Sequence, residues 1–276
     1  MPAAVAPVLA GTGVAAYVDG SVWWKALLAL VVSLALQVGV NYANDYSDGI
    51  RGTDDVRVGP MRLVGSGVAA PAAVKRAAFL AFGVAGVAGL VLAASTAWWL
   101  LAVGAVSVVA AWYYTGGSKP YGYLGLGEVM VFVFFGLVAV VGTSYVQSEE
   151  WTGAAWFAGT GIGALACGIL VVNNLRDIPT DTVAGKMTLA VRIGDTATRR
   201  LYLVLVLVAV ACIGAVAALT TWWALVGLLF LVPAVPALRT VLGGAVGPAL
   251  IPVLQSTGVS ELAWAALVAG ALVGAS

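Results

Sequence analysis

The 276-residue chain contains no histidine, only two cysteines and only 9% charged residues. The lack of histidine removes the most common general base, a frequent metal ligand and the usual haem ligand. Any chemistry must therefore depend on Asp, Glu, Lys, Arg or Tyr side chains, or on a bound metal. Cys167 and Cys212 both lie in apolar runs, which predicts two buried free thiols rather than a disulfide or a metal-binding pair.

Hydrophobic residues make up 62% of the chain, more than a water-soluble core of this size could bury. Many segments reach the roughly 20 apolar residues that a membrane-spanning helix needs, and abundant Gly and Ala favour close helix packing in lipid. We therefore expect an all-α, multi-span transmembrane bundle of about nine helices, forming one integral membrane domain over residues 1–276. The expected spans are 2–17, 22–45, two within 77–114, 124–145, 154–175, two within 201–238, and 249–275.

The basic residues are distributed unevenly between the expected loops. The loops after the second, fourth, sixth and eighth spans hold five, one, five and one of the 13 Lys and Arg residues. Because positively charged loops face the cytoplasm, this bias predicts a cytoplasmic N-terminus and an external C-terminus in the plasma membrane of a bacterium. The polar motifs described next then lie on the cytoplasmic side.

A polar stripe follows the second apolar span. Asn41, Asn44, Asp45 and Asp48 are spaced i, i+3, i+4 and i+7, which places them on one face of a continuing helix. The two carboxylates repel each other and lie near the negatively polarised C-terminal end of that helix. A cation is therefore expected beside them, and Mg2+ suits hard carboxylate oxygens and takes its remaining ligands from water and phosphate.

A similar cluster, NNLRDIPTD, begins at Asn173, 129 residues after Asn44, and again ends an apolar span. Two such clusters at one membrane face can converge on one site. Two carboxylate groups could then hold Mg2+ ions, and their members are Asp45, Asp48 and Asp54 in the first cluster and Asp177 and Asp181 in the second.

Basic side chains accompany both clusters. Arg51, Arg62, Lys186 and Arg192 are candidates for direct contact with phosphate, although each could instead contact anionic lipid. A magnesium-bridged pyrophosphate is the natural ligand, because Mg2+ and basic groups neutralise the charge that develops when a C–O bond breaks. With an apolar tail between the helices, this ligand would be a polyprenyl diphosphate.

The block from Tyr113 to Glu128 contains a third set of candidates. Glu128 lies at the edge of an apolar span, where an ionisable group is costly and usually functional. We expect this loop to hold an aromatic acceptor, with Lys119 or an arginine facing its carboxylate and a tyrosine face near an allylic cation. The candidate tyrosines, which could instead be interfacial belt residues, are Tyr113, Tyr114 and Tyr121.

Four motifs, NYANDYSDGIRGTD, GPMRLVGSG, YYTGGSKPYGYLGLGE and NNLRDIPTDTVAGKMTLAVRIG, resemble those of the UbiA superfamily of intramembrane prenyltransferases. They are most similar to the 1,4-dihydroxy-2-naphthoate polyprenyltransferase branch, called MenA, and the resemblance covers nearly the whole chain. It implies transfer of a polyprenyl group from polyprenyl diphosphate to 1,4-dihydroxy-2-naphthoate. Carbon dioxide and diphosphate would leave, and the product would be demethylmenaquinone, an intermediate of menaquinone synthesis.

The resemblance also assigns roles to particular residues. Its first Mg2+-diphosphate motif maps onto Asn41, Asp45, Asp48 and Asp54, and its second onto Asp177 and Asp181. Together with the reasoning above, the candidate catalytic residues are Asp45, Asp48, Asp177, Asp181, Lys119 and Glu128. The candidate diphosphate-binding residues are Arg51, Arg62, Lys186, Arg192, Asn41, Asn44 and Asn174.

Two other functions are compatible with parts of this pattern. A prenyltransferase of the same type could use another acceptor, such as 4-hydroxybenzoate or a phosphosugar. An ion-coupled transporter could also use intramembrane Asp clusters to bind cations. The location of the carboxylates at helix ends on one face, beside basic residues, favours the enzyme. We expect membrane lipids but no nucleic acid among its partners.

Overall fold

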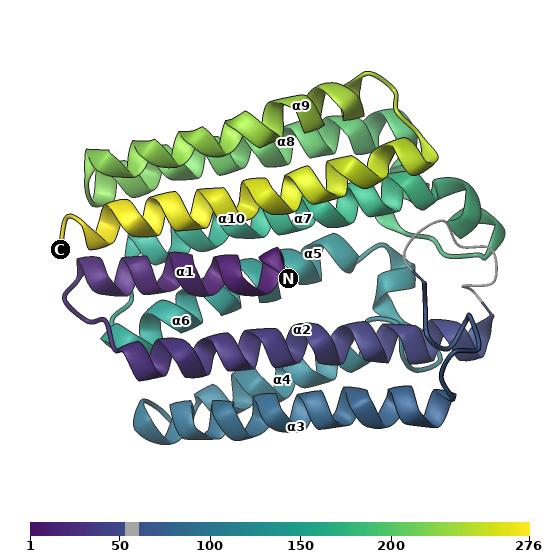
Figure 1. Ribbon diagram of the computed structural model, residues 1–276, viewed down its shortest axis with the longest axis horizontal. Coiled ribbons are helices and arrows are strands. Elements are labelled where there is room, and N and C mark those ends of the chain that lie inside the picture. Colours follow the sequence, from purple (N-terminus) through teal and green to yellow (C-terminus); the bar gives the residue numbers. More distant parts are fainter. Residues whose placement is uncertain (53–60) are drawn as a thin grey trace.

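The structure is a computed structural model that describes residues 1–52 and 61–276. Within these residues every regular element is helical, and the long helices run roughly parallel to one another (Figure 1). The main helices are α1 (Pro2–Tyr17), α2 (Trp23–Arg51), α3 (Pro71–Ser95), α4 (Leu100–Tyr113), α5 (Gly127–Val131), α6 (Ala139–Ser148), α7 (Gly153–Val183), α8 (Leu189–Leu219), α9 (Leu231–Leu242) and α10 (Ile251–Val273).

Four short segments complete the helical set. They are η1 (Tyr121–Leu124), η2 (Phe132–Val138), η3 (Trp222–Phe230) and η4 (Gly247–Leu250). Three of them join neighbours into longer rods, since α5, η2 and α6 are continuous, η3 leads into α9, and η4 leads into α10. The described chain therefore contains nine helical rods, as expected. Seven of the rods are long and apolar enough to cross a membrane, whereas α1 and α4 are shorter.

The sequence predicted the helix breaks correctly but placed several helix ends too early. The break between α3 and α4 falls at Thr96, and the one between α8 and η3 falls at Thr220, as expected. However, α2 continues past Asp45 to Arg51, and α7 continues past Leu175 to Val183. Apolar runs mark only the part of a helix that lies in lipid, and polar residues can extend it into the interface. The described carboxylates of the two motifs, Asp45 and Asp48 on α2 and Asp177 and Asp181 on α7, therefore lie near the C-terminal ends of these helices.

Close helix packing depends on small residues, as the composition predicts. Gly136 in η2 faces α7 so closely that a Cβ atom there would lie 2.5 Å from the Gly159 carbonyl oxygen and 2.6 Å from the Gly163 Cα atom. Such contacts between backbones are how helices associate in lipid, where burial of apolar area gives little net gain. They hold the rod that begins with α5, and hence Glu128, against α7.

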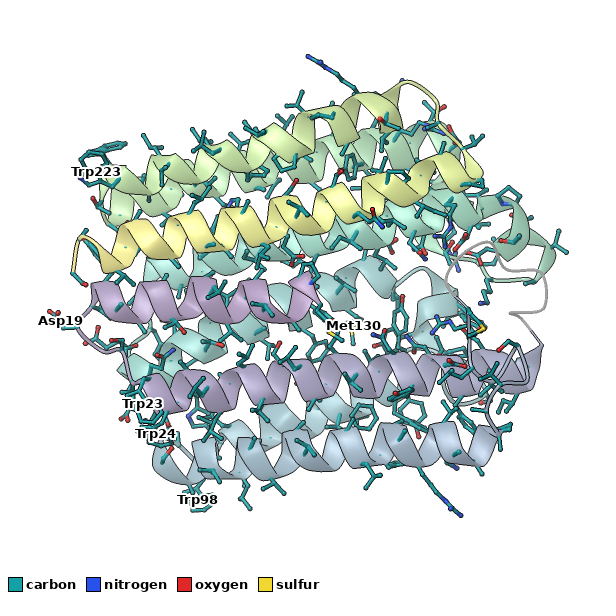
Figure 2. The ribbon with its side chains drawn as sticks, in the orientation of Figure 1. Asp19, Trp23, Trp24, Trp98, Met130 and Trp223 are labelled. Carbon is teal, nitrogen blue, oxygen red and sulfur yellow. The ribbon has the colours of Figure 1, made fainter. Side chains whose placement is uncertain are left out.

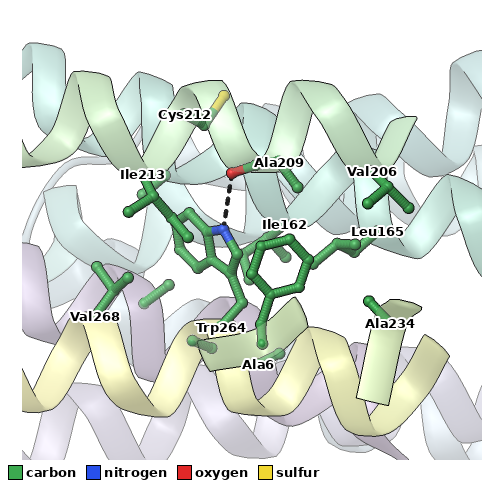
Figure 3. Packing of buried hydrophobic residues seen from close by; sticks show 14 of the residues in the cluster. Ala6, Ile162, Leu165, Val206, Ala209, Cys212, Ile213, Ala234, Trp264 and Val268 are labelled. Atoms are coloured by element: carbon green, nitrogen blue, oxygen red, sulfur yellow. Dashed lines mark hydrogen bonds between the residues drawn. The ribbon is translucent and has the colours of Figure 1, made fainter. Parts of the chain in front are cut away.

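The largest buried cluster surrounds Trp264 of α10 (Figure 3). Its indole is fully buried and donates a hydrogen bond to the Ala209 carbonyl oxygen of α8 at 3.1 Å. Ile162 and Leu165 of α7 pack on the same cluster. This cluster fixes α7, and with it the second acidic motif, against α8 and α10. A smaller cluster of Ala43, Ala78 and Phe82 joins α2 to α3.

The two ends of the bundle differ in chemistry. Asp19, Trp23, Trp24, Trp98 and Trp223 lie at one end (Figure 2), as expected of an interfacial aromatic belt. The C-terminal ends of α2 and α7 lie at the opposite end (Figure 1). The bundle therefore presents both acidic motifs at the same end.

Candidate active site

Asp45 is almost fully buried on α2, and its carboxylate is occupied by backbone donors. The amide nitrogen of Leu63 lies 2.9 Å from Oδ2, and that of Val64 lies 3.0 Å from Oδ1. A glycine-rich loop, residues 61–67, is therefore tied to α2 by the first acidic residue of the motif.

Asp48, one turn further along, faces different partners. The Tyr123 hydroxyl donates to its Oδ1 at 2.5 Å, and the Lys186 ammonium lies 3.7 Å from its Oδ2. The Lys186 ammonium also lies 4.9 Å from the centre of the Tyr123 ring. Since Asp48 belongs to α2, Tyr123 to η1 and Lys186 to the loop after α7, this contact joins the three motifs that the sequence singled out.

Arg51 and Asn44 connect the end of α2 to the loop after α4. The Arg51 guanidinium donates to the carbonyl oxygens of Thr115 and Gly117 and lies 5.5 Å from the Tyr123 ring centre. The Thr115 hydroxyl donates to Asn44 Oδ1 at 2.8 Å. These contacts hold the loop that carries Tyr121 and Tyr123 over the first acidic motif.

Arg62 and Asn41 also approach each other. Arg62 Nη1 lies 3.5 Å from the Asn41 carbonyl oxygen, at the longest separation that still counts as a hydrogen bond. The Asn41 residue itself is exposed. Arg62 therefore stands on the loop that Asp45 holds, above the polar stripe of α2.

The second acidic motif is organised by a residue that the sequence analysis overlooked. Arg176 is buried and donates to both oxygens of Asp177, from Nε and Nη2 at 2.6 Å each. Its Nη2 also donates to Asn173 Oδ1 at 2.9 Å. The backbone oxygen of Asp181 accepts the amide of Lys186 at 2.8 Å, which fixes the turn that presents the lysine.

Tyr114 lies where the acidic groups converge. Burial raises the pKa of its phenol far above the usual value, and the charges of Glu128, Tyr121, Asp48 and Asp181 raise that pKa further. The Tyr114 and Tyr121 rings meet edge to face at 5.5 Å, and burial raises the pKa of Tyr121 to about 12. Both phenols therefore stay protonated at neutral pH and can donate hydrogen bonds.

Glu128 is buried at the start of α5 and pairs with α7. Its Oε1 accepts a hydrogen bond from the Asn174 side-chain nitrogen at 2.9 Å, and its Oε2 has no hydrogen-bond partner among the described residues. Gly127 packs on the Tyr114 hydroxyl, which would lie 3.3 Å from a Cβ atom at that position. Glu128 and Asn174 thus form a buried polar pair, and the partly buried Tyr114 lies beside it.

The remaining candidates lie further out. Tyr113 is exposed at the end of α4, and Lys119 is exposed on the loop that follows. Arg192 is exposed near the start of α8, where its Nε donates to the Met187 carbonyl oxygen at 3.0 Å. Asp54 lies outside the described residues. Local spacing does not predict the contact between Tyr123 and Asp48, because the two residues are 75 positions apart in the sequence.

The carboxylates suit a Mg2+ site whose ligands are shared between protein, water and phosphate better than a site made of protein ligands alone. Within residues 1–52 and 61–276, no group of three or more His, Cys, Asp or Glu side chains is placed to hold a metal by itself. Mg2+ in phosphate-handling sites uses one or two carboxylates and completes its shell with water and phosphate oxygens. Asp48 near the end of α2, and Asp177 and Asp181 near the end of α7, are at the same end of the bundle and are the described carboxylates available for such a partial set (Figure 1).

Curated relatives match almost the entire chain. The 1,4-dihydroxy-2-naphthoate octaprenyltransferase of Mycobacterium tuberculosis is 57% identical over 274 residues, which cover 99% of this chain and 93% of the relative. The protein of the same name from Escherichia coli is 37% identical over 227 residues, which cover 77% of this chain and 71% of the relative.

Solved structures share the fold at low sequence identity. A UbiA homolog from Aeropyrum pernix in its apo form superposes with a TM-score of 0.74 at 15% identity, covering 95% of this chain and 96% of that one. A UbiA homolog from Archaeoglobus fulgidus bound to DMAPP and Mg2+ gives a TM-score of 0.66 at 14% identity, covering 99% and 96%. The UbiA prenyltransferase family model matches residues 4–245. The chain is therefore a multi-pass membrane protein that belongs to the UbiA prenyltransferase family.

Proposed function

We propose that this protein transfers a polyprenyl group from polyprenyl diphosphate to 1,4-dihydroxy-2-naphthoate, releasing diphosphate and carbon dioxide and forming the reduced, quinol form of demethylmenaquinone. The single observation that supports a diphosphate site most directly is the meeting of Asp48, Tyr123 and Lys186. It brings an acidic group, a phenol and an ammonium from three separate motifs to one place.

The choice of acceptor is supported by the relatives. The proteins from Mycobacterium tuberculosis and Escherichia coli are both named 1,4-dihydroxy-2-naphthoate octaprenyltransferases, and the first aligns along nearly the whole chain. The loop after α4, η1 and α5 are where an aromatic acceptor would lie, because Tyr114, Tyr121 and Glu128 gather there beside the acidic motifs.

The proposed mechanism is ionisation followed by capture. Asp48 and the second motif, Asp177 and Asp181, would hold Mg2+, which when bound supplies charge neutralisation for the departing diphosphate. Lys186 contributes the protein's own positive charge to the same oxygens, and Arg62 holds the diphosphate equally well in the ground state and in the transition state.

The chain's aromatic residues serve the second half of the reaction. The faces of Tyr114 and Tyr121 stabilise the allylic cation, since an aromatic face attracts a cation. A new C–C bond forms between the prenyl carbon and the ring carbon that bears the carboxylate. The bond from that ring carbon to the carboxylate then breaks, carbon dioxide leaves, and its electron pair restores the aromatic ring. No net proton removal is needed, which is compatible with a chain that has no histidine.

We place this site at the cytoplasmic side of a bacterial plasma membrane. Twelve of the 13 Lys and Arg residues lie in the connections after α2, α4, α7 and α9 or in the parts of the helices next to them, and such positively charged segments stay in the cytoplasm. The N-terminus is then cytoplasmic and the C-terminus external, and residues 1–276 act as one membrane domain.

The test is prenyl transfer by the purified protein in lipid vesicles. The assay contains 1,4-dihydroxy-2-naphthoate, a polyprenyl diphosphate and Mg2+, and it follows the prenylated product and carbon dioxide separately. We expect both to form together and both to stop with EDTA and in the Asp177→Asn variant. The folded state of each variant is checked by its thermal unfolding in detergent.

Other outcomes would replace the proposal. Turnover with 4-hydroxybenzoate or a phosphosugar, but not with the naphthoate, would keep the enzyme class and change the acceptor. Cation-driven flux across the vesicle membrane without prenyl transfer would identify a transporter.

A further inference from the structure

The glycine-rich loop after α2 binds to Asp45 through successive backbone amides. The N–H groups of Leu63 and Val64 converge on the two carboxylate oxygens at 2.9 and 3.0 Å. Consecutive N–H groups that point to one place form an anion-binding concavity. In this protein the anion in that concavity is the buried Asp45 side chain.

Helix geometry separates Asp45 from Asp48. Residues advance about 100° around an α-helix, so Gly49 lies about 40° from Asp45 while Asp48 lies about 60° away on the other side. Gly49 also faces the loop, because a Cβ atom there would lie 2.4 Å from Val64 Cγ1. One side of the last turns of α2 therefore seats the loop, and the neighbouring side turns Asp48 toward Tyr123 and Lys186.

The loop has its own internal hydrogen bonds. The Arg62 carbonyl oxygen accepts the amide of Ser66 at 3.0 Å, and the Leu63 carbonyl oxygen accepts the amide of Ala69 at 3.0 Å. These bonds tie the segment from Arg62 to Ala69 together, so a change at its attachment to Asp45 should also displace Arg62. Arg62 directly precedes the two anchored amides, and its guanidinium reaches the Asn41 carbonyl oxygen.

We propose that Asp45 is a positioning residue, which fastens the glycine-rich loop so that Arg62 stands over the diphosphate site, and that Asp48 is the carboxylate of α2 that serves the metal. This inference rests on the function proposed above. The sequence pattern predicts that Asp45 and Asp48 are both metal ligands. The inference makes Asp45 the anchor of the loop and Asp48 the metal ligand. Loss of Asp45 should therefore resemble loss of Arg62 rather than loss of Asp48.

The first experiment measures hydrogen exchange in the metal-free protein, with no substrate present. In Asp45→Asn, an NH2 group replaces one side-chain oxygen and cannot accept a hydrogen bond, so the backbone amides of Leu63 and Val64 should exchange faster. Gly49→Ala should have the same effect, because its methyl group displaces Val64 while leaving the carboxylate intact. Asp48→Asn is the matched control, and it should leave exchange at these two amides unchanged.

The second experiment measures steady-state kinetics in vesicles. Asp45→Asn, Gly49→Ala and Arg62→Gln should each raise the KM for polyprenyl diphosphate about tenfold, the size expected for one lost charged hydrogen bond. The kcat and the Mg2+ half-saturation at saturating substrate should stay within about threefold of wild type. The Asp45→Asn/Arg62→Gln double variant should be no worse than either single variant, since both changes remove the same contact.

Three results would overturn the inference. One is an Asp45→Asn variant that shifts Mg2+ half-saturation as strongly as Asp48→Asn while exchange at Leu63 and Val64 stays slow. Another is additive KM effects of the Asp45 and Arg62 changes. The third is a Gly49→Ala variant whose Leu63 and Val64 amides exchange faster while its KM for polyprenyl diphosphate is unchanged. This variant tests the inference even if Asp45→Asn fails to fold. If the wild-type protein shows no prenyl transfer, the proposed function fails, and the exchange experiment still tests the anchor.

Discussion

The ion pair between Asp48 and Lys186 offers the sharpest test of how the two acidic motifs are joined. Their charged atoms are 3.7 Å apart, and the side chains are only 7% and 13% exposed. Coulomb's law gives an attraction of about 4 kcal/mol at this 3.7 Å separation for an effective dielectric constant of about 20. Desolvation of both groups offsets part of this, so we expect a coupling of about 1 to 3 kcal/mol.

The coupling can be measured with a double-mutant cycle. Asp48→Asn keeps an oxygen that can accept the Tyr123 hydroxyl, so it removes the charge with little change in shape. The free energy of unfolding is measured in mixed detergent for wild type, Asp48→Asn, Lys186→Gln and the double variant. Either single change should destabilise the protein, because it leaves one partly buried charge unpaired, and the double variant should recover part of the loss.

A coupling below about 0.5 kcal/mol would refute the reasoning, since that is the range of exposed pairs that contribute little. It would mean that the loop after α7 is not held to α2 by this contact. Lys186→Arg serves as a control, because it keeps the charge but changes the geometry. The free energy of unfolding of Lys186→Arg should lie between those of wild type and Lys186→Gln.

Three further predictions concern the groups around the site. Because burial and nearby carboxylates raise the pKa of Tyr114 above its usual 10.0, its phenol is neutral in the folded protein through pH 9 and only begins to ionise above that usual value. The rate-versus-pH profiles of wild type and Tyr114→Phe should therefore have the same shape between pH 6 and 9, with a lower rate for the variant. Asn174→Ala removes the hydrogen-bond donor to Glu128 Oε1 and should destabilise the protein by about 1 to 3 kcal/mol, measured by thermal unfolding. Gly136→Val should cost more than about 3 kcal/mol or prevent folding, because its side chain would meet α7 backbone.

Each of these predictions has a result that contradicts it. A new ionisation between pH 6 and 9 that disappears in Tyr114→Phe would show that the phenol titrates there. If Glu128→Gln/Asn174→Ala is no more stable than Asn174→Ala, the cost does not come from the unpaired carboxyl group. Gly142→Val is the control for Gly136, since nothing lies within 4 Å of a Cβ atom at Gly142, and equal losses in both variants would exclude the α7 contact as the cause.

The membrane fold follows from the sequence because its signals are local. Apolar runs of spanning length set the number of helices, and the polar residues at Thr96 and Thr220 set two of the breaks. The same criterion failed at the ends of α2 and α7, since hydropathy reports where lipid ends and not where the helix ends. The segment from Asn174 to Val183 remains helical although Pro179 lies within it, and the helix ends just before Gly185, whose φ of 72° is left-handed.

The candidate site was only partly visible in the sequence. Spacing along a helix identified the acidic motifs and the basic residues that follow them, because residues three and four apart share a face. It did not reveal Tyr123 or Arg176, whose importance comes from partners distant in the sequence or from burial.

The sequence by itself determined that this is a membrane-embedded helical protein whose ionisable groups gather in a few motifs, since hydropathy and helical periodicity depend only on neighbouring residues. Only the tertiary structure decided which partners each motif residue contacts, and hence its role. Asp45 and Asp48 are three residues apart and chemically identical, yet one accepts the backbone of a loop and the other meets Tyr123 and Lys186. Their roles differ because the elements packed against adjacent sides of α2 are different, and that packing is set by contacts far along the chain.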